Sequence, residues 1–236
     1  MDHDDLVRRV RALREKGSSS KEIARALGMK PAAVVPIVRA IAAADQASLE
    51  ASPEQRTVDC WVSPGWSDGL TVDGHPEWID IDDPGSGTSG LVALVVARDT
   101  GRSRVRVCGY LVDVYCLGVK NTIGPRVMDQ HGLAEFARTF FSMYPAQPLA
   151  VPVELARHLV FGAVEYARTL GFEPARGSDF DKTRNHLGQW TGPSAITFGK
   201  DGKPLYIQGP HDNPNRVMRT LERSIGAGNY DYLITV

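Results

Sequence analysis

Residues 91–119, LVALVVARDTGRSRVRVCGYLVDVYCLGV, carry the clearest pair of strand signals in the chain. The first seven residues form a continuous apolar run, which is typical of a central strand buried on both faces. A Thr-Gly turn follows, and residues 102–119 then form a long run rich in β-branched and aromatic residues. We expect this second run to bend at Gly109. The segment therefore predicts neighbouring strands in the core of the main domain.

Two helices are predicted downstream, over residues 132–143 and 152–170. In the second helix, apolar side chains recur at helical spacing and define one buried stripe. This stripe consists of Val153, Ala156, Val160, Val164 and Ala167. Gly171 is expected to end the helix.

The last third of the chain predicts a hairpin, a helix and a strand. Residues 195–209, AITFGKDGKPLYIQG, read as two apolar-alternating runs around an Asp-Gly turn. A final helix is expected over residues 214–225 with Asn213 as its N-cap. Residues 230–236 are expected to form an edge strand. Because strands and helices do not alternate regularly, the predicted fold class is α+β with a mostly antiparallel sheet.

Residues 5–42, DLVRRVRALREKGSSSKEIARALGMKPAAVVPIVRAIA, predict three short helices. The apolar residues spaced for their buried faces are Leu6, Val10 and Leu13, then Ile23, Ala24 and Leu27, then Val34, Ile37, Val38 and Ile41. Ser19 and Glu22 form a capping box before the second helix. Gly28 permits the positive φ angle of a tight turn, and Pro31 suits the first turn of the third helix.

This segment resembles the homeodomain-like helix-turn-helix of bacterial regulators, resolvases and transposases, over about the first 45 residues. In that family the third helix enters the major groove. The resemblance implies contacts with double-stranded DNA from Lys30, Ala32, Ala33, Pro36 and Arg39. Because few of these side chains read base edges, we expect a homodimer on two half-sites. The alternative is a three-helix bundle that contacts protein.

Charge is distributed unevenly along the predicted domains. The helix-turn-helix head, residues 1–45, carries +3; an acidic linker and long loop, residues 46–90, carry −8; and the α+β body, residues 91–236, carries +4. Within the linker, residues 57–62 read as a short strand, and two tryptophans indicate that parts of the loop pack down. The acidic segment is interpreted as a solvated linker, or as a segment that lies on a basic surface and competes with DNA.

Composition excludes several classes of protein. The longest apolar run has seven residues, from Leu91 to Ala97, and a membrane helix needs about 20. The N-terminus has no apolar signal core, so the expected location is the cytoplasm. Three cysteines without a CxxC pair argue against a disulfide framework or zinc ribbon. No Walker loop, dinucleotide fingerprint or HExxH motif is present, so we expect no cofactor and no metal.

Three arginines, Arg102, Arg104 and Arg106, alternate with other residues. On a strand they would share one face. They are interpreted either as a phosphate-contacting stripe or as the charges that protect an exposed strand from aggregation.

Four side chains of the body are candidates for catalysis: Asp113, Cys116, Lys120 and His158. A charged Asp113 in an apolar strand is costly without a partner. Cys116 with His158 would make a nucleophile and base. The alternative is structural: an Asp113 tied to Lys120 or to backbone, and a half-buried, hydrogen-bonded His158.

The stretches at 109–121, 158–174, 198–213 and 230–233 are similar to a domain found in bacterial proteins of unassigned function, which implies no activity. The favoured hypothesis is a bacterial DNA-binding regulator whose body dimerises or senses a small-molecule or protein effector. One alternative is an enzyme that acts on nucleic acid or nucleotides through the body. Another is a protein-interaction module built on the three helices.

Overall fold

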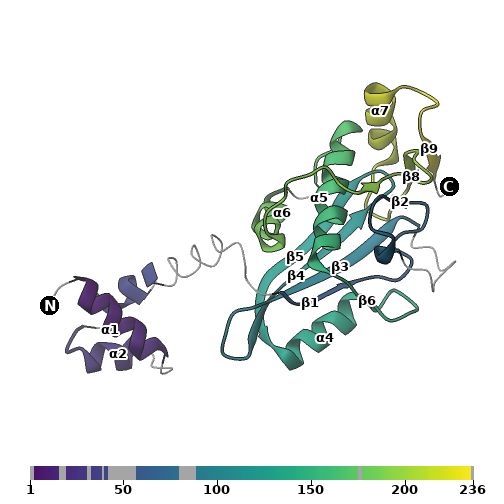
Figure 1. The fold of residues 1–236 in the computed structure, drawn as a ribbon. Helices are drawn as coiled ribbons and strands as arrows, with labels where there is room; N and C mark the ends of the chain where they lie inside the picture. The colour runs from purple at the N-terminus through teal and green to yellow at the C-terminus, as the bar shows by residue number, and fades with distance from the viewer. Residues whose placement is uncertain are drawn as a thin grey trace. The chain divides into compact units, whose positions relative to one another are not determined.

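The structure is a computed structural model, which divides the chain into two compact units, Met1–Pro53 and Glu54–Val236 (Figure 1). The residues that it describes are 3–15, 20–30, 33–38, 40–41, 57–79, 89–174 and 177–234. Within the described helices, no segment is both long enough and apolar enough to cross a lipid bilayer.

The N-terminal unit is helical. It contains α1 (His3–Glu15) and α2 (Ser20–Ala26), and residues 33–38 and 40–41 are also helical. A small core joins them, made of buried Val10, Ile23, Ala24, Val34 and Ile41. Gly28 has a φ of 63°, which confirms the tight turn expected at this glycine. Ser19 and Pro31 lie outside the described residues.

The body is built around a five-stranded sheet in the order β5-β4-β3-β1-β6, with every neighbouring pair antiparallel. Its strands are β1 (Thr57–Val62), β3 (Leu91–Asp99), β4 (Arg104–Asp113), β5 (Gly118–Asp129) and β6 (Leu149–Ala150). This sheet and the surrounding helices confirm the α+β class.

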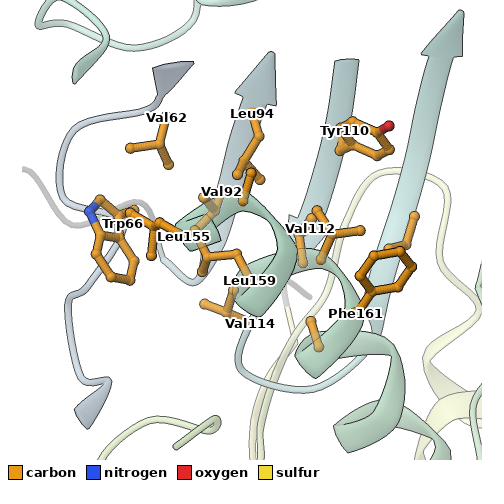
Figure 2. Packing of buried hydrophobic residues seen from close by; sticks show 14 of the residues in the cluster. Val62, Trp66, Val92, Leu94, Tyr110, Val112, Val114, Leu155, Leu159 and Phe161 are labelled. Carbon is orange, nitrogen blue, oxygen red and sulfur yellow. The ribbon is translucent and has the colours of Figure 1, made fainter. Parts of the chain in front are cut away.

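Two helices cover the two faces of the sheet (Figure 1). Helix α5 (Val153–Thr169) packs on one face, where Leu155 and Leu159 approach Val92 and Leu94 (Figure 2). Helix α4 (Gln130–Phe140) packs on the other face, against the alternate residues of β3. Because both faces are covered, β3 is apolar at consecutive positions, as its sequence predicts.

The acidic linker predicted over residues 46–90 is wrong for residues 57–79, which belong to the body. Strand β1 lies inside the body sheet, between β3 and β6. The following loop also packs onto the body, because Trp66 is 1% exposed and Trp78 is 7% exposed. Its short elements are β2 (Thr71–Val72) and η1 (Pro76–Trp78). Residues 57–79 therefore belong to the body.

The predicted strand over residues 102–119 is too long. Strand β4 ends at Asp113, residues 114–117 form a turn, and β5 returns beside it from Gly118. The pairing between β4 and β5 does shift its register near Gly109. A side chain at Gly109 would meet the ring of Phe140 at 2.8 Å, so this glycine lets α4 approach the sheet.

The predicted C-terminal hairpin is only partly correct. Asp201 and Gly202 form the expected turn, with φ angles of 53° and 80°. The strands on either side do not pair with each other: β7 (Ile196–Thr197) pairs with β2, and β8 (Leu205–Ile207) pairs in parallel with β9 (Asp231–Leu233).

Three more helical segments complete the body. These are α6 (Gly177–Thr183), η2 (Arg184–Leu187) and α7 (Pro214–Ile225). Helix α7 has the predicted bounds, and the side chain of Asn213 accepts a hydrogen bond from the backbone N–H of Arg216, which confirms the predicted cap.

Candidate functional site

The face predicted to contact DNA is partly described. Lys30, Ala33 and Pro36 are exposed, at the start of the third helical segment and along it. The side chains of Ala32 and Arg39 lie outside the described residues. The exposed Lys30 lies two residues after Gly28, which forms the turn.

Other cations of this unit are also exposed. Arg8, Arg9 and Arg25 lie on the surfaces of α1 and α2. Arg9 is 3.2 Å from the carboxylate of Asp5, in a pair one helical turn apart. Such an exposed pair contributes little to stability. The exposed cations named here thus lie on α1, on α2 and at Lys30.

The three arginines predicted to form one stripe do not share one environment. Arg102 lies in the turn before β4 with a φ of 55°, so it is not part of a strand. Arg104 is exposed at the start of β4, whereas Arg106 is 7% exposed. Of the predicted phosphate contacts, Arg102 and Arg104 are accessible and Arg106 is not.

Asp113 ends β4 by accepting backbone hydrogen bonds. Its Oδ1 accepts the N–H of Tyr115 at 3.0 Å and the N–H of Cys116 at 2.9 Å. Burial raises the pKa of Asp113 from 3.8 to about 6, against the effect of these donors and of Lys120. The carboxyl group therefore organises the turn that reverses the chain into β5.

We expect Asp113→Asn to change the free energy of unfolding at neutral pH by no more than about 1 kcal/mol, because its amide oxygen can accept the same N–H groups. Asp113→Ala leaves two buried N–H groups without an acceptor and should cost about 2 kcal/mol. Because the pKa of Asp113 is higher in the folded state than in the unfolded state, the folded state binds this proton more tightly. The free energy of unfolding of the wild type therefore falls as pH rises from 3.8 to about 6, and the asparagine variant, which does not titrate, lacks this fall. Urea unfolding across this pH range measures both effects. An asparagine variant as unstable as the alanine variant would contradict the capping role.

Cys116 and Lys120 lie near Asp113. Cys116 is completely buried, and desolvation raises the pKa of its thiol. Lys120 forms a part-buried ion pair with Asp212, and the second oxygen of Asp212 accepts the N–H of Gly209 at 2.9 Å. This pair holds the loop before α7 against β5. A buried, protonated thiol is a poor nucleophile.

His158 belongs to a different cluster, made of aromatic rings. Its ring centroid lies 5.1 Å from that of Trp78 and 5.0 Å from that of Trp190. Its Nδ1 accepts the N–H of Ala195 at 2.8 Å, and burial lowers its pKa. His75 stacks on the outer side of Trp78 at 3.9 Å. The Nε2 of His158 lies 3.6 Å from the carboxylate of Glu154. The described contacts of His158 are those of a hydrogen-bonded structural residue, and none of them is with Cys116.

Sequence reasoning did not find this aromatic cluster. Trp190 lies in a loop and donates its indole N–H to Glu165 of α5 at 2.6 Å. Its ring also stacks on Phe161 at 5.7 Å. Large aromatic residues in Gly- and Pro-rich stretches indicate packing, but their partners come from distant segments.

Neither metal ligands nor known relatives indicate a function. Among the described residues, no three His, Cys, Asp or Glu side chains are grouped as a metal site would require. No family model, curated protein or solved structure matches the chain.

Proposed function

We propose that the chain is a DNA-binding regulatory protein. The three helical segments of the N-terminal unit act as a homeodomain-like helix-turn-helix, and the body mediates dimerisation or senses an effector. The observation that carries this proposal is the exposed Lys30, two residues after the Gly28 turn and three before the described start of the third helical segment at Ala33. Exposed cations on α1 and α2 support it, because contacts between Lys or Arg side chains and DNA phosphates provide most of the affinity of non-specific DNA binding.

The test is to replace Lys30 and Arg39 together by alanine and to measure binding of a labelled duplex at several salt concentrations. Each lost phosphate contact should reduce the slope of log K against log salt by about 1, so we expect a reduction of about 2. The matched control is Arg219→Ala with Arg223→Ala, which removes the same charge from exposed positions of α7. An unchanged slope in the Lys30 and Arg39 variant, together with normal folding, would overturn the docking model.

A second candidate function is a protein contact through the same helices. The exposed residues on the described part of the third helical segment are apolar: Ala33, Val35, Pro36 and Ala40. Val35 is 36% exposed, which is high for a valine on a short helix. The salt series distinguishes the two functions. If the helices bind protein and not DNA, there is no salt-dependent DNA affinity for the Lys30 substitution to change.

A further inference from the structure

A cavity of about 700 Å³, open to solvent and lined partly by exposed residues, lies on the α4 side of the body. Helix α4, strand β1 and residues 142–148 form its walls. Cavities that bind small molecules have volumes of about 300 to 1,000 Å³. The size therefore suits a small organic molecule.

The small side chains of α4 explain why the cavity exists. The helix rests on β3 and β4 through Leu133, which is 2% exposed. Towards β1 it presents Ala134 and Ala137, which line the cavity together with Trp61 of β1. Trp61 packs against the same buried cluster as Leu133 and is only partly buried, because two alanines are too short to cover the rest of the indole ring.

Hydrogen bonds fix the walls in place. The hydroxyl of Tyr144 donates to the carbonyl of Leu91 at 3.0 Å, and its backbone N–H donates to the carbonyl of Phe141 at 3.0 Å. Trp61 pairs with Ala150 of β6. The cavity is thus preformed, so a ligand would not have to organise it.

The lining determines the chemistry of the ligand. Trp61 and Tyr144 offer two partly exposed aromatic rings. The ring of Phe141, which is 4% exposed, supports Tyr144, with the two centroids 6.3 Å apart at an angle of 60°. Asp59 and Arg138 contribute one charge of each sign. A charged ligand would be attracted by one and repelled by the other, whereas a flat apolar ring can pack on the aromatic side chains.

We propose that this cavity binds a neutral, flat, largely apolar small molecule, and that this molecule is the effector of the proposed regulator. The second part rests on the proposed function. It is supported by the position of β1, which begins at Thr57, three residues after the body unit begins at Glu54. The ligand would contact Asp59 and Trp61 of this strand, and the pairing of β1 with β3 shifts its register between Thr57 and Asp59, directly at the first of these two residues.

The test uses the full chain and the neutral fluorescent probe N-phenyl-1-naphthylamine, without DNA. We expect saturable binding of one probe per chain at micromolar concentration. Ala137→Trp fills the cavity and should weaken binding at least tenfold. The matched control is Thr139→Trp, which places the same side chain on an exposed part of α4 that does not line the cavity, and should change binding less than twofold.

Absence of probe binding to the wild type, or equal binding by the wild type and the Ala137 variant, would overturn the proposal. If Ala137→Trp does not fold, Ala134→Leu is judged by the same criterion. Conversion of a dimer into a monomer by Ala137→Trp would identify a second copy as the occupant and would also overturn it. Probe binding that leaves the DNA affinity unchanged would confirm the cavity and overturn the effector role. Probe binding by a chain that binds no DNA would overturn the proposed function alone.

Discussion

Replacement of Arg98 by methionine is expected to lower the free energy of unfolding by about 3 to 4 kcal/mol. Arg98 is 5% exposed in β3. Its guanidinium group donates to the carbonyls of His186 and Leu187 and to the hydroxyl of Thr57. The substitution removes these hydrogen bonds and leaves the carbonyl of His186 buried without this donor. Urea unfolding followed by circular dichroism measures the effect.

The matched control is Arg104→Met, on the neighbouring strand. Arg104 is exposed, and its described hydrogen bond, to the carbonyl of Val127, is long at 3.4 Å. We expect a change within about 0.5 kcal/mol. Equal effects at the two positions would show that Arg98 does not fasten η2 to the sheet.

Acid is expected to destabilise the body through His186, which is 7% exposed. Burial, with Arg98 and Arg106 nearby, lowers its pKa from 6.5 to about 4. The folded state therefore favours the neutral ring, which hydrogen-bonds the carbonyl of Val96 at 3.0 Å. Stability from this group is present above pH 6.5 and is lost as pH falls towards 4. The loss amounts to roughly 3 kcal/mol, from 1.36 kcal/mol per pKa unit.

The measurement compares the pH dependence of unfolding in the wild type and in His186→Gln, whose amide can still donate to Val96. Groups such as His158 and Asp113 titrate in both proteins, so their contributions cancel in the difference. The wild type should lose about 3 kcal/mol more than the variant between pH 6.5 and 4. Parallel curves would contradict the assignment of acid sensitivity to His186.

The hydrophobic pattern predicted the elements that are buried along a repeating face. Helix α5 and strand β3 have the expected bounds to within a residue or two, because their apolar residues follow the period of each element. Strand β5 was missed because polar residues such as Asn121 and Arg126 interrupt it at the edge of the sheet. An edge strand is only partly buried, so its sequence carries a weaker pattern.

The polar residues of the candidate sites were less predictable. The sequence indicated the structural alternative for Asp113, and its contacts agree with it. It did not indicate that Arg98 binds a segment 89 residues away, or that Arg106 is buried while Arg104 is exposed. Such contacts depend on tertiary packing, which leaves no local pattern. The cavity beside Trp61 was not found for the same reason, since its walls come from two separate segments, residues 59–61 and 130–148.

The three cysteines of the chain lie at informative places, Cys60 in β1, Cys108 in β4 and Cys116 in the β4–β5 turn. All are buried, and desolvation raises the pKa of Cys60 and of Cys108 to about 12. The folded protein therefore shields every sulfur from maleimides, and alkylation has to wait until the surrounding structure opens. The alkylation rate at each position then measures local opening in the first strand of the body, in the inner strand β4 and in the Asp113 turn.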